Sequence, residues 1–198
     1  MRVALTFDTE HPGRPAPNGV DVRILDILRE SGVRATFFLQ GRWARSSPDI
    51  ARRIADEGHL IGNHSNYHAP MDALTEEGFR HDVRKAEETI RRVTGIEPRP
   101  WFRCPFGAGI DNARVLEALA ALGYTHVGWD VDPTDWDESQ TARGVEEAIL
   151  AGIRAREEDS IVLMHSWPAA TCDALPAVLA GLRDAGAELV SVDELALG

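Results

Sequence analysis

The chain has 198 residues, 43% hydrophobic and 27% charged, which is typical of a globular protein with a sizeable core. Its formal net charge of −11 argues against nucleic acid or an anionic membrane surface as a main partner, because both need basic patches. No apolar stretch in the sequence reaches the ~20 residues that a membrane span needs. No signal peptide precedes the first β-rich run. If Met1 is the native start, we expect a cytoplasmic protein; if the natural chain begins earlier, we expect an extracellular one.

Short β-rich runs alternate with longer helical patterns along the chain. The expected strands span residues 2–7, 34–39, 59–63, 101–103, 125–130, 160–164 and 188–192. The expected helices span residues 20–31, 48–57, 75–94, 111–122, 142–156 and 174–185, several of them ending at a glycine. This alternation predicts parallel strands joined by crossover helices. We therefore expect an α/β fold in which residues 1–198 form a single domain, a distorted (β/α)7 barrel that is TIM-barrel-like, or less readily an open doubly wound sheet.

Polar residues of catalytic type follow five of the expected strands, at the end where such folds place their functional sites. They are Asp8, Glu10 and His11, then His64 and His68, then Arg103, then Asp130, Asp132 and Asp135, and finally His165. We expect these side chains to meet at one mouth of the barrel.

His64 and His68 stand four residues apart in NHSNYH, a spacing at which two imidazoles can share one divalent ion. A carboxylate from another strand end would complete a His-His-carboxylate set with open positions. Such an open set suits hydrolysis better than structural support, because structural zinc sites are closed. The alternative is a capped turn followed by a surface histidine.

Hydrolysis also needs a base and an acid. Asp8 can be the base, with Arg103 holding its carboxylate ionised and oriented. His165 can be the acid, with a neighbouring aspartate keeping its imidazole protonated. For each of these residues taken singly, a structural salt bridge is the alternative.

The other histidines and the two cysteines carry weaker signals. We expect His59 to pack, His81 to be solvated and His126 to lie in the core, while His11 is either a loop residue or a ligand. Cys104 and Cys172 match no metal-site spacing, so we expect two free buried thiols.

From LTFD to LVSVDELA, the chain resembles the polysaccharide deacetylases of carbohydrate esterase family 4. ATFFLQG is similar to the second-strand signature of that family, and NHSNYH to its His-Ser/Thr-x-x-His metal motif. FRCPFG is similar to its Arg-Pro-Pro-Tyr-Gly motif, DPTDW to Asp-x-x-Asp-Trp and LMH to Leu-x-His. The resemblance implies a hydrolase of carbohydrate metabolism with one divalent metal ion, usually zinc and sometimes cobalt or nickel.

The resemblance also implies a role for particular residues. These are Asp8 as base, oriented by Arg103; His64 and His68 as metal ligands; the backbone N–H of Phe106 as oxyanion donor; His165 as acid, tuned by Asp132; and Trp136 and Leu163 as walls of the pocket for the acetyl methyl group.

The first motif departs from the family pattern. The common form is Thr-Phe-Asp-Asp, whose second aspartate binds the metal, and here Thr9 stands at that position. Some members place the metal carboxylate two residues after the base, so we expect Glu10 to be the third ligand. In FRCPFG, which follows the fourth expected strand, Cys104 replaces a proline and Phe106 replaces a tyrosine of the family motif.

We therefore expect a metal-dependent deacetylase that removes an N-acetyl group from an amino sugar or N-acetylated glycan and releases acetate. Its substrate would be an acetylated sugar or oligosaccharide. Three alternatives stay open: an O-acetyl (xylan-type) esterase, a hydrolase of a small cyclic amide or imide, and a catalytically silent sugar-binding domain. The sequence does not define the sugar, its chain length or the oligomeric state of the protein.

Overall fold

The structure, a computed structural model, describes residues 1–11, 19–156 and 158–195. Its strands form one seven-stranded parallel sheet: β1 (Arg2–Thr9), β2 (Thr36–Leu39), β3 (Leu60–Asn63), β4 (Trp101–Phe102), β5 (Thr125–His126), β6 (Ser160–His165) and β7 (Glu188–Val190). The order across the sheet is β5-β4-β3-β2-β1-β6, and β7 pairs with the first residues of β1. Beyond β5, a parallel bridge between Val131 and Val162 returns the chain to β6, so the sheet curls into a distorted barrel. The expected α/β fold is confirmed.

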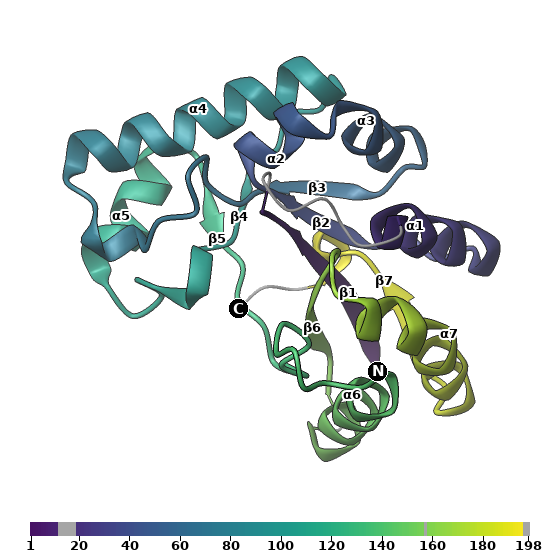
Figure 1. Cartoon of the computed structure of the whole chain (residues 1–198). Coiled ribbons are helices and arrows are strands. Elements are labelled where there is room, and N and C mark those ends of the chain that lie inside the picture. The colour runs from purple at the N-terminus through teal and green to yellow at the C-terminus, as the bar shows by residue number, and fades with distance from the viewer. Residues whose placement is uncertain (12–18, 157, 196–198) are drawn as a thin grey trace.

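Helices cover the outside of this sheet, as Figure 1 shows for α1, α3, α4, α6 and α7. The α-helices are α1 (Val20–Ser31), α2 (Gly41–Ser46), α3 (Pro48–Asp56), α4 (Glu76–Thr94), α5 (Ala113–Ala121), α6 (Ala142–Arg156) and α7 (Ala169–Asp184). Short 3₁₀ turns are η2 (Met71–Ala73), η3 (Pro105–Gly107) and η4 (Val192–Glu194). Within the described part of the chain, every helix is too short or too polar to cross a membrane.

Some element bounds differ from the expected ones for local reasons. The strand expected at 125–130 ends at His126, because the backbone N–H groups of Asp130 and Val131 instead donate to the carbonyl of Ile161 in β6. Helix α7 begins at Ala169 and tolerates Pro176 in its interior, which is why the sequence favoured a later start. The N-cap of α5 is Asn112, whose side chain accepts a hydrogen bond from the N–H of Arg114.

Side chains of β1 and β6 alternate between two environments, as the pleat of a strand requires. In β1, Val3, Leu5 and Phe7 pack in the large cluster that includes the helices. The intervening positions face the inside of the barrel, where Ala4 packs with Ile161 of β6. We call the residues of a strand that face the inside of the barrel its inward series; in each strand this series leads to the carboxyl end.

Gly62 of β3 belongs to the inward series, and its lack of a side chain leaves room for the ring of Phe38 in β2. A Cβ at this position would lie 2.5 Å from Cδ1 of Phe38, which is closer than two non-bonded carbon atoms can approach. His64, two residues further along, is the next inward position. β3 therefore brings the imidazole of His64 to the cavity at the end of the barrel.

Candidate active site

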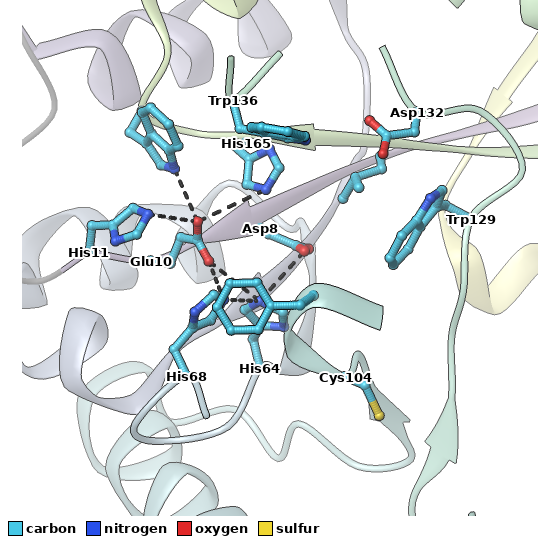
Figure 2. Close-up of a pocket in the computed structure, with 13 residues that line it drawn as sticks. Asp8, Glu10, His11, His64, His68, Cys104, Trp129, Asp132, Trp136 and His165 are labelled. Carbon is cyan, nitrogen blue, oxygen red and sulfur yellow. Dashed lines mark hydrogen bonds and ion pairs between the residues drawn. The ribbon is translucent and has the colours of Figure 1, made fainter. Parts of the chain in front are cut away.

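A cavity of about 480 Å³ opens at the carboxyl ends of the strands. Its lining residues are Asp8, Glu10, His11, His64, His68, Cys104, Phe106, Trp129, Asp132, Trp136, Leu163, His165 and Trp167. Figure 2 shows Glu10 at the centre of this pocket, with imidazoles on several sides. Of the residues expected at this mouth, Arg103, Asp130 and Asp135 lie outside this lining. Arg103 contacts the pocket residue Asp8 from behind, and Asp135 contacts His165. The expectation for Asp130 is wrong, because its carboxylate accepts from the backbone N–H of Ile161 and pairs with Arg156.

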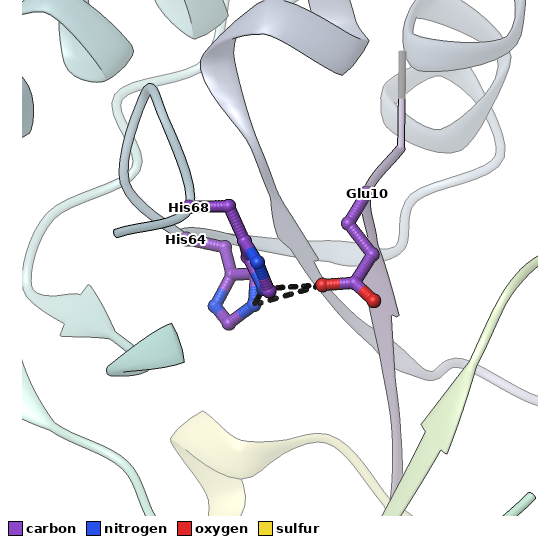
Figure 3. A group of neighbouring side chains, drawn as sticks. All are labelled: Glu10, His64 and His68. Atoms are coloured by element: carbon purple, nitrogen blue, oxygen red, sulfur yellow. Dashed lines mark hydrogen bonds and ion pairs between the residues drawn. The ribbon is translucent and has the colours of Figure 1, made fainter. Parts of the chain in front are cut away.

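Glu10, His64 and His68 form a candidate metal site. One possible ligand atom from each residue lies within 4.8 Å of the other two. Nε2 of His64 is 3.7 Å from Oε2 of Glu10 and 3.2 Å from Nε2 of His68. Oε2 of Glu10 also contacts Nε2 of His68, and Figure 3 shows both imidazoles facing this carboxylate. Two imidazole nitrogens and one carboxylate oxygen fit a divalent ion such as zinc.

The backbone orients His64 for this purpose. Its Nδ1 lies 2.9 Å from the carbonyl oxygen of Arg103, which can only accept a hydrogen bond. Nδ1 therefore carries a proton, and Nε2 is the nitrogen that faces Glu10 and His68. A ligand histidine fixed by a hydrogen bond at its other nitrogen is the usual arrangement in metal sites.

In this structure, strand alternation places the side chain of Glu10, and not that of Thr9, beside the two histidines. Asp8 belongs to the inward series of β1, and Glu10 is the next inward position beyond the strand. Thr9 points to the other face, where it is fully buried and its hydroxyl donates to the carbonyl of Phe38 at 3.2 Å. A carboxylate at position 9 of this backbone would face away from His64.

The loop that carries His64 and His68 is held by a residue that the sequence analysis missed. Asp82, buried in α4, accepts hydrogen bonds from the backbone N–H groups of Asn66 at 2.6 Å and Tyr67 at 3.1 Å. Burial raises the pKa of Asp82, although these hydrogen bonds oppose the shift. The signal was present in the sequence, since Asp82 falls on the apolar stripe of a helix that is otherwise charged.

Asp8 and Arg103 form a buried ion pair behind the candidate metal site. Nη1 of Arg103 is 2.9 Å from Oδ1 of Asp8 and also donates to the hydroxyl of Thr6 at 2.7 Å. The remaining guanidinium donors reach the carbonyls of Val127 and Gly128. Burial lowers the pKa of Arg103, while the charge of Asp8 opposes that shift. Four acceptors thus fix the guanidinium, and Oδ2 of Asp8 stays 3.6 Å from Nε2 of His64.

His165 lies on the opposite side of the pocket and pairs with Asp135. Its Nδ1 is 2.7 Å from Oδ1 of Asp135, and its backbone N–H donates to Oδ2 at 2.8 Å. The hydroxyl of Thr171 donates to the same Oδ2. Burial alone would lower the pKa of His165, but the hydrogen bond and charge of Asp135 outweigh burial and raise it to about 9. His165 is therefore held in the form that can donate a proton.

The expected pairing of Asp132 with His165 is wrong, because the described carboxylate in contact with this ring belongs to Asp135. Asp132 lines the pocket, and its side chain accepts from the backbone N–H of Thr134 at 2.7 Å. It stabilises the turn at Thr134, which has a φ of 51°. Of the two aspartates of DPTDW, Asp135 therefore takes the role that the resemblance implied for Asp132.

The electrostatics of Glu10 and its two histidines are strongly coupled. Burial would raise the pKa of Glu10, but hydrogen bonds from His11, His64 and His68 hold it well below its usual range. Burial would lower the pKa of His64, yet the carboxylates of Asp8 and Glu10 raise it. Burial dominates at His68 and lowers its pKa. Glu10 is therefore ionised, as a metal ligand must be.

The three residues expected to surround the acetyl group all line the cavity. Phe106 has a φ of 59° and is 69% exposed, and its ring packs edge-on against His68 at 4.5 Å. Trp136 is half exposed and Leu163 is buried. Figure 2 shows Trp136 beside His165, across the pocket from His68.

The remaining histidines and cysteines mostly lie as expected. His59 is buried against Phe37, His81 is exposed and His126 is partly buried. Both cysteines are free and buried, although Cys104 also lines the cavity. His11 departs from the loop-residue alternative, because its Nε2 lies 2.9 Å from Oε1 of Glu10.

The fold and this arrangement define a class, that of parallel α/β barrel proteins with a candidate hydrolytic metal centre at the strand ends. A sequence model described as polysaccharide deacetylase matches residues 1–127, more than half of the chain. The chain belongs to the polysaccharide deacetylase family, carbohydrate esterase family 4.

Two curated relatives and one solved structure illustrate the family. The peptidoglycan-N-acetylglucosamine deacetylase of Bacillus cereus is 33% identical over 197 residues, covering 98% of this chain and 67% of that protein. The peptidoglycan-N-acetylmuramic acid deacetylase PdaA of Bacillus subtilis is 29% identical over 193 residues, covering 98% and 70%. The crystal structure of BA3943 from Bacillus anthracis, described as a CE4 family pseudoenzyme, matches with a TM-score of 0.84 and 29% identity, covering 98% of this chain and 64% of that chain. Because the fold also occurs in a pseudoenzyme, the residues of the site must carry any functional conclusion.

Proposed function

We propose that this chain is a metal-dependent hydrolase that removes the N-acetyl group from an amino sugar or N-acetylated glycan and releases acetate. The observation that carries the proposal is the contact between base and candidate metal site, where Oδ2 of Asp8 lies 3.6 Å from Nε2 of His64. A carboxylate so placed can take a proton from a water molecule that enters the site. The similarity to two peptidoglycan deacetylases supports an acetylated glycan as substrate.

Each residue has a separate task in this proposal. Glu10, His64 and His68 would hold the ion, which supplies Lewis-acid polarisation of the acetyl carbonyl and a lower pKa for a water molecule. Asp8, oriented by the guanidinium of Arg103 at 2.9 Å, accepts the proton of the attacking water. The backbone N–H of Phe106 would donate to the carbonyl oxygen as negative charge develops there.

The acid side of the pocket favours an amide over an ester. An amine is a poor leaving group unless its nitrogen is protonated, so amide hydrolysis needs a proton donor at the departing atom. His165 supplies that donor at Nε2, because Asp135 holds its other ring nitrogen. Leu163 and Trp136 would enclose the acetyl methyl group, as an apolar pocket with a few placed polar groups does for small ligands.

The proposal is tested by acetate release from two substrates, chitooligosaccharides and acetylated xylan, with zinc present. We expect the wild-type protein to release acetate faster from the N-acetylated substrate. Asp8→Asn should lower that rate at least ~10²-fold, since general-base catalysis contributes about that much. Zinc content should stay at the wild-type level in this variant. Faster release from xylan would instead assign an esterase, and a near-normal rate for Asp8→Asn would remove Asp8 as the base.

A further inference from the structure

The two oxygens of Glu10 have different surroundings. Oε2 faces His64 and His68, as described above. Oε1 faces away from them and lies 2.9 Å from Nε2 of His11 and 3.4 Å from Nε1 of Trp167. Nε2 of His165 is 4.0 Å from the same oxygen, which is beyond hydrogen-bond distance. The oxygen that is not turned toward the two histidines is therefore held by two separate N–H groups.

These two donors come from different parts of the barrel and support each other. His11 follows β1 and has a φ of 63°, a conformation that histidine adopts more readily than most residues. Trp167 follows β6, two residues beyond His165. The rings of His11 and Trp167 pack edge to face, with centroids 5.3 Å apart and planes at 75°. Each ring therefore restricts the rotation of the other, and both point an N–H at Oε1.

A glutamate needs such support more than an aspartate would. Its side chain has one more rotatable bond, so fixing its carboxylate costs more conformational entropy. A donor at the second oxygen stops the carboxylate from turning about its last bond. In metal sites, hydrogen bonds of this kind orient the ligand, and their loss typically weakens metal binding 10–100-fold.

We propose that His11 and Trp167 are positioning residues, which hold Oε1 of Glu10 so that Oε2 alone is presented to the metal with His64 and His68. The inference rests on the proposed function only in requiring that this site binds a divalent ion. This support explains how Glu10 can serve as the carboxylate ligand in this chain, where Thr9 faces the opposite side of β1.

The test measures zinc affinity by competition with a chromophoric chelator, using three variants of the full chain. Trp167→Phe keeps the ring and removes the N–H, and His11→Asn removes the imidazole while tolerating the positive φ. We expect each to bind zinc about 10-fold more weakly than wild type, and the double variant more weakly still. Trp136→Phe is the matched control: Trp136 lines the same cavity, and among the described residues it makes no hydrogen bond or ring contact with Glu10, His64 or His68, so we expect wild-type zinc affinity.

Two further measurements separate positioning from other roles. In a Glu10→Ala background, Trp167→Phe and His11→Asn should cause no further loss of zinc affinity, because there is no carboxylate left to hold. The urea unfolding midpoints of the metal-free Trp167→Phe and Trp136→Phe proteins should agree closely. Wild-type affinity in both Trp167→Phe and His11→Asn would overturn the inference, and so would a further loss from His11→Asn in the Glu10→Ala background, which would make His11 a ligand. Failure of the wild-type protein to bind zinc would instead remove the proposed function.

Discussion

Asp135 holds His165 at two points, because one carboxylate oxygen lies 2.7 Å from Nδ1 of the ring and the other accepts the backbone N–H at 2.8 Å. Ring and backbone of the candidate acid are thus fixed by a single buried side chain. The hydroxyl of Thr171 completes the shell of donors around that carboxylate.

Asp135→Asn should therefore disable the acid without emptying the metal site. We expect kcat for an N-acetylated substrate to fall at least ~10²-fold, the usual contribution of general-acid catalysis. Zinc affinity should remain near that of the wild type, since Asp135 contacts none of the three candidate ligands among the described residues. Asp132→Asn is the matched change in the same segment and should cause a much smaller loss. If kcat fell equally in the two variants, Asp132 would also have to act on His165, contrary to this assignment.

Arg103 is the most deeply buried cation of the described chain, with 0% of its side chain exposed. Arg103→Met should lower the free energy of unfolding by about 3–5 kcal/mol, because it leaves the charge of Asp8 buried without its partner. Urea unfolding of the metal-free protein measures this effect. Arg143→Met is a suitable control: that arginine pairs with Glu147 on the surface of α6 at 85% exposure, so we expect little change. A similarly small loss for Arg103→Met would show that the buried pair contributes little to stability.

His59 predicts a pH dependence of stability that is separate from catalysis. Burial lowers the pKa of His59 to about 4, with Arg34 and Arg53 adding to the shift and Glu57 opposing it. In the unfolded chain His59 takes up a proton near pH 6.5, but in the folded chain it does so only near pH 4. The contribution of His59 to the free energy of unfolding is therefore fully present above pH 6.5, and it is lost as the pH falls from there toward 4.

The matching experiment compares wild type with His59→Asn, whose amide oxygen can still accept from the N–H of Ala35 as Nδ1 does at 3.2 Å. Between pH 7.5 and pH 5, the wild-type free energy of unfolding should fall by about 2 kcal/mol more than that of the variant. Urea titrations of the metal-free proteins at both pH values provide the comparison. Parallel losses in the two proteins would show that His59 is not the group that titrates.

Much of the fold and of the site could be predicted from the sequence, because the relevant signals are local. The alternation of strands and helices predicted the barrel, and the polar residues after the strands predicted the end of the barrel at which the site lies. The spacing of His64 and His68 predicts a shared ligand pair, whereas Glu10 was expected as the third ligand only from the resemblance to family members with a carboxylate two residues after the base. The inferences from the residues themselves depend on the pleat of a strand or the length of a short loop.

The parts that could not be predicted depend on contacts between distant segments. The sequence does not distinguish Asp132 from Asp135 as the partner of His165, and only the folded structure shows that Asp135 makes the contact. Asp82 holds the histidine loop from a helix that follows it in the chain, so only the packing of α4 reveals its role. Trp167 and Glu10 are 157 residues apart in the chain, and their contact joins the segments that follow β6 and β1.

The most direct measurement is a zinc titration of chelator-stripped protein, with bound metal and acetate release from a chitooligosaccharide recorded together. We expect acetate release to be absent before zinc is added, to rise in proportion to bound zinc, and to level off at about one ion per chain, since the described site offers one set of three ligands. Glu10→Ala should need a much higher zinc concentration to reach its plateau. A protein that binds no zinc, or that releases acetate equally well without it, would contradict a metal-dependent deacetylase.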